Sequence, residues 1–252
     1  MKLKDLETMI NEQEATVDSR YIGAALPALL RKTYLWMAFA MIITGIVAYG
    51  MATVTYTAAD GSTLPIAFKI FQSRGTFWIL FIAELGMVFT LSARIMRLSL
   101  PTATLLFIAY STVNGVMLSA IFLVYTMQSI ASAFFVTAAT FGAMSLYGYF
   151  TKSSLDGLGK YLTMGLVGLI IAIAVNIFLH NGMLNLIISG VAVVLFTILT
   201  AYDTQKIKIM LALQPDAGEA AQRVALLGAL SLYLDFINLF IYILQFFGGR
   251  NN

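Results

Sequence analysis

Cysteine is absent from the 252-residue sequence, histidine occurs once, and only 11% of the residues are charged. The lack of cysteine excludes disulfides, thiolate metal sites and cysteine nucleophiles. A single histidine, His180, is too few for a histidine metal site. Soluble domains carry about 25% charged residues, so the low charged fraction argues against a soluble globular fold.

Apolar residues make up 60% of the chain, and the mean hydropathy is +0.88. Apolar stretches of about 19 residues or more follow one another from Tyr34 to Phe247, and a helix needs about 20 residues to cross a bilayer. Each stretch is expected to be a helix, because in lipid it must satisfy its own backbone hydrogen bonds. The chain is therefore predicted to be an all-α polytopic membrane protein with seven transmembrane helices. The predicted spans are 34–54, 76–93, 102–125, 130–150, 161–179, 183–203 and 225–247.

The N-terminal region carries both charge signs before any long apolar run. Asp5, Glu7 and Glu12 interrupt the basic and then apolar layout of a signal peptide, so the first span is expected to be retained. We interpret residues 1–32 as a cytoplasmic arm and residues 33–252 as the transmembrane domain.

Lys and Arg are distributed unevenly between the two predicted faces, twelve against three. The face that includes the arm carries Lys2, Lys4, Arg20, Arg31, Lys32, Arg94, Arg97, Lys152, Lys160, Lys206, Lys208 and Arg223. The opposite face carries Lys69, Arg74 and Arg250. Cytoplasmic loops of membrane proteins are enriched in Lys and Arg, so the N-terminus is predicted to be cytoplasmic and the C-terminus outside.

Three acidic residues, Glu84, Asp203 and Asp235, fall within or at the edge of apolar spans. A charged Asp at mid-bilayer costs on the order of 3 kcal/mol, so it persists where it faces the bundle interior or has a partner. Asp235 has about ten residues of span on either side and must point inward. Asn238, three residues further along the same helical face, is predicted to support it by hydrogen bonding.

Asp203 is expected at the cytoplasmic end of the sixth span, about one turn from Lys206. By itself it is compatible with a hydrated interfacial residue. At 1.5 Å per residue, Asp203 lies roughly 5 Å from Lys206, whereas Asp235 lies roughly 18 Å from Arg223. The two carboxylates can therefore meet only if the seventh helix begins outside the membrane or a cavity carries water inward.

Three stretches make the chain recognisable: residues 141–155 (FGAMSLYGYFTKSSL), 200–208 (TAYDTQKIK) and 228–248 (GALSLYLDFINLFIYILQFFG). With these motifs the chain resembles the transmembrane Bax inhibitor motif (Bax inhibitor-1) family, and in particular its bacterial inner-membrane members. The similarity covers about residues 34–250. The resemblance implies seven helices, with the C-terminal helix surrounded by the other six.

The resemblance also implies a function. It places the family's pair of aspartates, a pH-responsive site for calcium leak across the membrane, on Asp203 and Asp235. It further implies an arginine near the cytoplasmic end of the second span that latches onto the sixth-span aspartate, with Arg94 as the nearest match and Arg97 as a rival. Glu84 and Asn238 are candidate supporting polar residues. Two carboxylates are too few for a tight calcium cage, so only a weak calcium site is expected, and no other cofactor.

Two alternatives come from other classes of protein. Aspartates in two consecutive spans resemble an intramembrane aspartyl protease, but bulky residues stand before Asp235 where such proteases have glycines, so no enzymatic activity is expected. A non-conducting regulator that binds another membrane protein, such as a quality-control protease, remains open. The basic loops lack interleaved aromatic residues and the chain has no Gly-rich phosphate loop, so nucleic acid is not an expected partner.

Overall fold

The computed structural model describes residues 25–58 and 61–249. Most of the predicted arm therefore lies outside the described residues, and its last residues, 26–32, already belong to the first helix. The elements in chain order are α2 (Leu26–Thr53), β1 (Thr55–Thr57), β2 (Thr63–Pro65), α3 (Ile66–Gln72), α4 (Arg74–Arg94), η1 (Ile95–Arg97), α5 (Leu100–Leu118), α6 (Ala120–Val124), α7 (Met127–Phe150), α8 (Asp156–Leu179), α9 (Gly182–Ala212) and α10 (Glu219–Phe247).

Seven helical segments in the described part of the chain are long and apolar enough to cross a membrane, which confirms the all-α polytopic fold. The second span is α4 with the short η1 turn, and the third is α5 continued by α6. The predicted spans were too short at several ends, most of all at α9, which continues to Ala212. A small antiparallel hairpin of β1 and β2, followed by α3, connects the first two spans and was not predicted.

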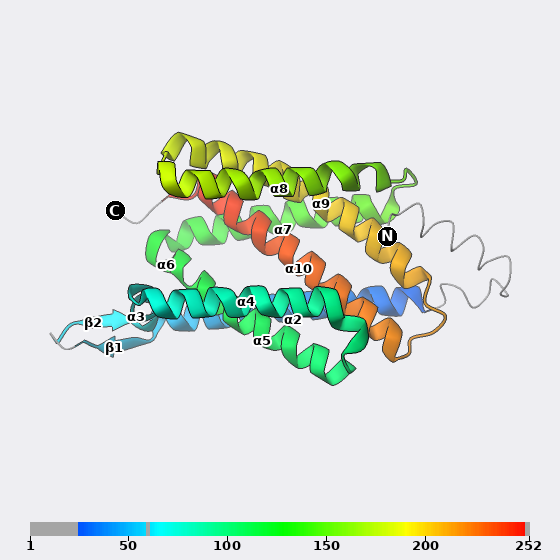
Figure 1. Ribbon diagram of the computed structural model, residues 1–252, viewed down its shortest axis with the longest axis horizontal. Helices are drawn as coiled ribbons and strands as arrows, with labels where there is room; N and C mark the ends of the chain where they lie inside the picture. The colour runs from blue at the N-terminus through cyan, green and yellow to red at the C-terminus, as the bar shows by residue number, and fades with distance from the viewer. Residues whose placement is uncertain (1–24, 59–60, 250–252) are drawn as a thin grey trace.

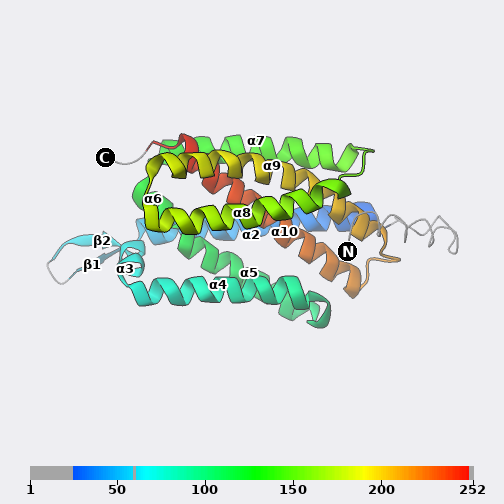
Figure 2. The ribbon, with the colours of Figure 1, turned by 45° about the horizontal axis from the view of Figure 1, so that its top comes forward.

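α10 is the central helix of the bundle and crosses it diagonally between α7, α8 and α9 on one side and α4 and α5 on the other (Figures 1 and 2). In its most apolar stretch 72% of the residues are buried, compared with 11% in α4 and in α8. The helices that pack directly on it are α2, α5, α7 and α9. The predicted central position of α10 is confirmed; around it, α4 packs mainly on α5 and α8 on α9, and the second span reaches α10 through η1.

α2 begins at one end of the bundle and α10 ends at the opposite end, as an odd number of spans requires (Figure 1). Basic residues of the described segments gather at the end where α2 begins: Arg31, Lys32, Arg94, Arg97, Lys152, Lys160, Lys206, Lys208 and Arg223. Lys69 and Arg74 lie at the other end. This arrangement agrees with the predicted orientation, which itself stays a prediction.

Small residues set the distance between the helices. A Cβ atom at Gly148 of α7 would collide with the carbonyl oxygen of Ala201 in α9, so only glycine permits this approach. A Cβ atom at Gly228 of α10 would lie 2.8 Å from a methyl carbon of Ile207 in α9. Close backbone approach of this kind is how helices pack in lipid, where apolar burial between helices provides little driving force.

Candidate functional site

Asp235 lies in the middle of α10 and is only 5% exposed. Its side chain therefore points into the bundle and away from lipid. Its Oδ2 atom is fully buried and has no hydrogen-bond partner among the described residues. Because a buried polar atom without a partner costs free energy, this oxygen needs a proton, a cation or water that the protein side chains do not supply.

Asp203 lies on α9 and lines a cavity of about 250 Å³ between α4, α9 and α10. Lys206, Ser92 and Ser231 supply polar groups to the same cavity. The prediction that Asp203 lies at the end of its helix is wrong, since α9 continues for nine residues beyond it to Ala212. The Asp203 side chain is half-buried.

The register of α9 against α10 brings the two aspartates to similar depths. Ser189 donates a hydrogen bond of 3.1 Å to Gln245, and Ile207 contacts Gly228. This antiparallel register places Asp203 opposite Ser231 and Leu232 of α10. That level is about one helical turn, or about 5 Å, from the level of Asp235.

The depth mismatch expected from the sequence is therefore much smaller in the structure. The earlier estimate measured depth from Lys206 and Arg223 as if both marked the end of a helix. Instead, α9 and α10 both extend beyond those residues, to Ala212 and from Glu219.

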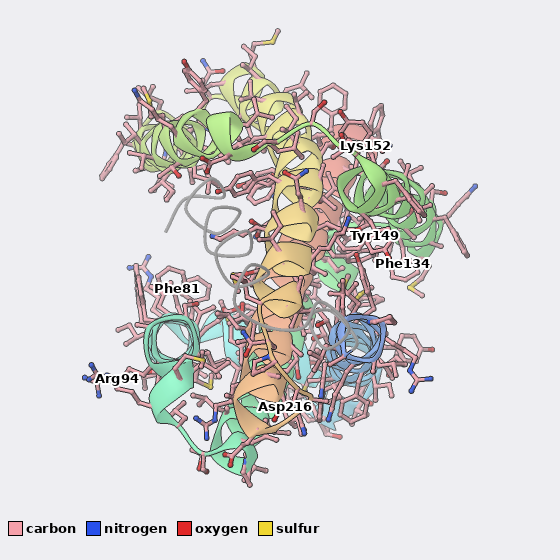
Figure 3. The ribbon with its side chains drawn as sticks, turned by 90° about the vertical axis from the view of Figure 1, so that its right-hand side faces the viewer. Phe81, Arg94, Phe134, Tyr149, Lys152 and Asp216 are labelled. Carbon is pink, nitrogen blue, oxygen red and sulfur yellow. The ribbon has the colours of Figure 1, made fainter. Side chains whose placement is uncertain are left out.

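Arg94, the predicted latch, is the last residue of α4 and is exposed. It points away from the other helices, whereas Phe81 lies on a different side of α4 (Figure 3). Arg97 is also exposed, and within the described residues neither arginine forms an ion pair with Asp203. The charged group beside Asp203 is Lys206, which interacts with it electrostatically. The latch assignment to Arg94 stays a prediction that requires its side chain to swing inward.

Glu84 belongs to a hydrogen-bonded chain that joins four helices. Asn114 of α5 donates to Glu84 of α4, and Tyr233 of α10 donates to Asn114 at 2.9 Å. The Tyr233 hydroxyl lies 2.6 Å from that of Thr44 in α2, which also reaches the Ser111 carbonyl oxygen at 2.9 Å. Tyr233 is fully buried, so this chain fixes the rotation of α10 within the bundle.

A second cavity, of about 680 Å³, lies between α4, α5 and α10. It lies toward the end of the bundle where α10 ends, opposite the end with most of the basic residues, and we call it the outer cavity. Glu84, Asn114, Asn238 and Gln245 are among its lining residues. Asn238 donates its amide hydrogen to the carbonyl oxygen of Leu234, 2.8 Å away, and not to Asp235. Its predicted support of Asp235 by hydrogen bonding is therefore not formed in this arrangement.

The two cavities follow the same side of α10, and Asp235 comes directly after Leu234, the first α10 residue of the outer cavity. The cavity at Asp203 reaches Ser231, and the outer cavity begins at Leu234. Both are also lined by α4, through Ser92 in one and Glu84 in the other. Asp235 therefore lies next to the inner edge of the outer cavity, one turn along α10 from Ser231, although its side chain lines neither cavity.

Other polar residues of the TAYDTQKIK stretch hold the α7 to α8 connection. Gln205 accepts a hydrogen bond of 2.8 Å from the backbone of Leu155 and donates one of 2.9 Å to the Ser153 carbonyl oxygen. Lys208 donates to the Tyr149 carbonyl oxygen at 2.8 Å and lies over the Tyr149 ring. Gln205 and Lys208 therefore have a structural role, whereas Asp203 of the same motif takes no part in these contacts.

Our sequence reasoning missed Asn114, Thr44 and the hydroxyl of Tyr233, because it searched the spans for acidic residues only. Asn114 carried a usable signal, since an amide within an apolar span also needs a partner. No group of three or more His, Asp or Glu side chains in the described segments is placed to hold a metal ion. Within the described segments, the spans away from their ends thus carry a single carboxylate, Glu84, and one pair, Asp203 and Asp235. So small a set of ligands suits weak or transient cation binding.

Comparison with known proteins bears on the same residues. Residues 26–252 match the model of the family described as "Inhibitor of apoptosis-promoting Bax1". The chain belongs to this Bax inhibitor-1 family. The inner membrane protein YbhL of Escherichia coli (strain K12) is 43% identical over 229 residues, which are 90% of this chain and 94% of YbhL.

Two further relatives are uncharacterized proteins. One from Borreliella burgdorferi is 41% identical, over 89% of this chain and 95% of that protein. One from Rickettsia prowazekii is 38% identical, over 94% of this chain and 96% of that protein. Membership of the Bax inhibitor-1 family covers all seven spans, including the helices that carry Asp203 and Asp235.

Proposed function

We propose that the protein is a pH-sensitive leak for calcium or a similar cation, gated by Asp203 and Asp235. The observation that carries the proposal is Asp235, a buried carboxylate with an unpartnered oxygen, within about one helical turn of the level of Asp203 and next to the inner edge of the outer cavity. The similarity to YbhL supports a location in the bacterial inner membrane. The distribution of Lys and Arg supports a cytoplasmic N-terminus and an outside C-terminus.

Two carboxylates that approach in a low-dielectric interior resist being ionised together, so they share a proton and titrate as a pair. Asp203 and Asp235 lie in such a setting, and a shared proton would satisfy the buried oxygen of Asp235. Loss or gain of that proton changes the charge along the proposed route. It also changes the attraction for calcium, which prefers ionised oxygen ligands.

The route follows the seam between α4 and α10. From the end of the bundle where α10 ends, the route passes through the outer cavity beside Glu84 and Asn238. It then passes Asp235 and continues through the cavity at Asp203. Lys206 lines the last part and competes with any cation for Asp203. A latch by Arg94 or Lys206 would lower the resting leak by holding Asp203.

Calcium flux into liposomes that contain only this protein, measured between about pH 5 and 8, tests the proposal directly, because shared carboxyl protons titrate across that range when buried. We expect flux above that of empty liposomes, with a pH dependence that is lost when either aspartate is replaced by Asn. No flux at any pH would overturn the leak, and a non-conducting regulator of another membrane protein would then be the better description.

A further inference from the structure

The outer cavity has features that passage of a metal ion does not require. Phe77 and Phe81 of α4 and Tyr110 of α5 form an aromatic wall beside the carboxylate of Glu84. Phe77, Phe81 and Glu84 follow one another along successive turns of α4, so the two phenylalanines lie between Glu84 and the outer end of the helix. The volume of about 680 Å³ is within the range of pockets that hold organic ligands, about 300 to 1,000 Å³.

Glu84 lacks a cationic partner. One of its oxygens accepts a hydrogen bond from Asn114, and within the described residues the other accepts none. No Lys, Arg or His is among the residues that line the outer cavity. A carboxylate at this depth in a membrane is stabilised by a positive charge or neutralised by a proton, and no side chain lining the cavity supplies that charge, so a cation that enters the cavity would find Glu84 unopposed.

The free donors and acceptors of the cavity are too few for a hard metal ion. The side-chain oxygen of Asn114 accepts from Tyr233, and that of Gln245 accepts from Ser189. This leaves one oxygen of Glu84, the side-chain oxygen of Asn238 and the hydroxyl of Tyr110. Calcium takes six to eight oxygens, several of them from carboxylates as a rule, and this set falls well short.

We infer that the outer cavity binds a small organic ammonium ion, with its charge at Glu84 and its apolar part against Phe77, Phe81 and Tyr110. Aromatic rings together with one carboxylate are the usual recognition elements for such cations. The site stands independently of the proposed gate at Asp203 and Asp235, because none of its contacts involves either aspartate. A bound ammonium ion would occupy the outer part of the seam between α4 and α10.

Trp78 provides a built-in reporter. Its ring lies 5.8 Å from that of Phe77 and 5.7 Å from that of Phe81, measured between centroids. The chain has two tryptophans, so Trp36→Phe leaves Trp78 as the only one. The fluorescence of this variant, purified at full length in lipid nanodiscs, is titrated with benzyltrimethylammonium and with its uncharged carbon isostere, neopentylbenzene.

We expect a saturable fluorescence change with the ammonium compound and none with the isostere. Glu84→Gln keeps an acceptor for Asn114 but removes the charge, and it should weaken binding about tenfold or more. Phe81→Leu should weaken binding about three- to fivefold by removing one aromatic wall. Asp216→Asn removes a carboxylate in the turn between α9 and α10, far along the chain from the cavity, and should leave binding unchanged.

Equal binding of the isostere would overturn the inference, since it would show partition into the bilayer or an apolar pocket. Unchanged affinity for benzyltrimethylammonium in both Glu84→Gln and Phe81→Leu would also overturn it. A third contrary result would be calcium binding that depends on Glu84 when the ammonium compound does not bind. If Glu84→Gln does not fold, Phe81→Leu still decides the matter. Binding here needs no ion gradient, so its failure and the failure of calcium flux are separate results.

Discussion

Tyr233, at the centre of α10, donates a hydrogen bond of 2.9 Å to the side-chain oxygen of Asn114 in α5. The same hydroxyl lies 2.6 Å from that of Thr44 in α2, and Asn114 in turn donates to Glu84 in α4. One tyrosine therefore connects the central helix to three others. It stands two residues from Asp235, so the rotation it imposes on α10 also sets the direction of the Asp235 carboxylate.

Replacing Tyr233 by Phe should lower the free energy of unfolding by about 1 to 2 kcal/mol, because buried Asn114 and Thr44 lose their shared partner. Denaturation in mixed micelles measures this difference. Tyr242→Phe, on the same helix, is the matched control: its hydroxyl forms no hydrogen bond within the described segments, and its ring keeps the stacking on Phe196. Equal effects of the two changes would contradict the role of the Tyr233 hydroxyl.

Replacing Gly148 by Ala should destabilise the bundle by about 2 kcal/mol or more, because the new methyl group would collide with the Ala201 carbonyl oxygen. Gly142, on the same helix, has open space around the corresponding position. Gly142→Ala should therefore be neutral or stabilise by up to about 1 kcal/mol. The same denaturation measurement compares the two variants, and similar losses in both would show that α7 and α9 tolerate separation.

Replacing Asp203 or Asp235 by Asn keeps the shape of the side chain and removes its charge. Each single change should flatten the pH dependence of calcium flux into liposomes, because the shared proton is lost in both cases. The double change should add little to either, since coupled groups are not additive. Additive effects would mean that the two carboxylates titrate separately and do not form one gate.

The candidates for a latch on Asp203 are Lys206 and Arg94, with Arg97 as the rival of Arg94. Since Lys206 lines the cavity and Arg94 is exposed, Lys206→Gln should raise the resting calcium leak at neutral pH more than Arg94→Ala does. Arg31→Ala, a change of similar size at an exposed arginine of α2, serves as the control and should leave the leak unchanged. A larger rise with Arg94→Ala would show that α4 rearranges to bring that arginine inward.

The orientation in the membrane follows from seven spans and from the uneven distribution of Lys and Arg. A reporter enzyme fused after Asn252 should be active only if it is of the type that works in the periplasm. Activity of a cytoplasmic reporter at the same position would reverse the predicted topology.

The sequence by itself determined the number and type of the spans. The length of an apolar run and its need to satisfy its own backbone in lipid are local properties, so seven helices could be predicted before any contact was known. The burial of Asp235 followed from the same reasoning, since a charged side chain in mid-span has no low-cost position facing lipid.

Only the tertiary structure decided how these helices meet. The length of α9 beyond Asp203, and the register that Gly228 and Ile207 impose, bring the two aspartates to within about one turn of each other. The chain of hydrogen bonds through Tyr233 likewise depends on the tilt and rotation of four helices. Hydropathy reports how deep a residue can lie in the bilayer, but it carries no information on which side chain of another helix it will face.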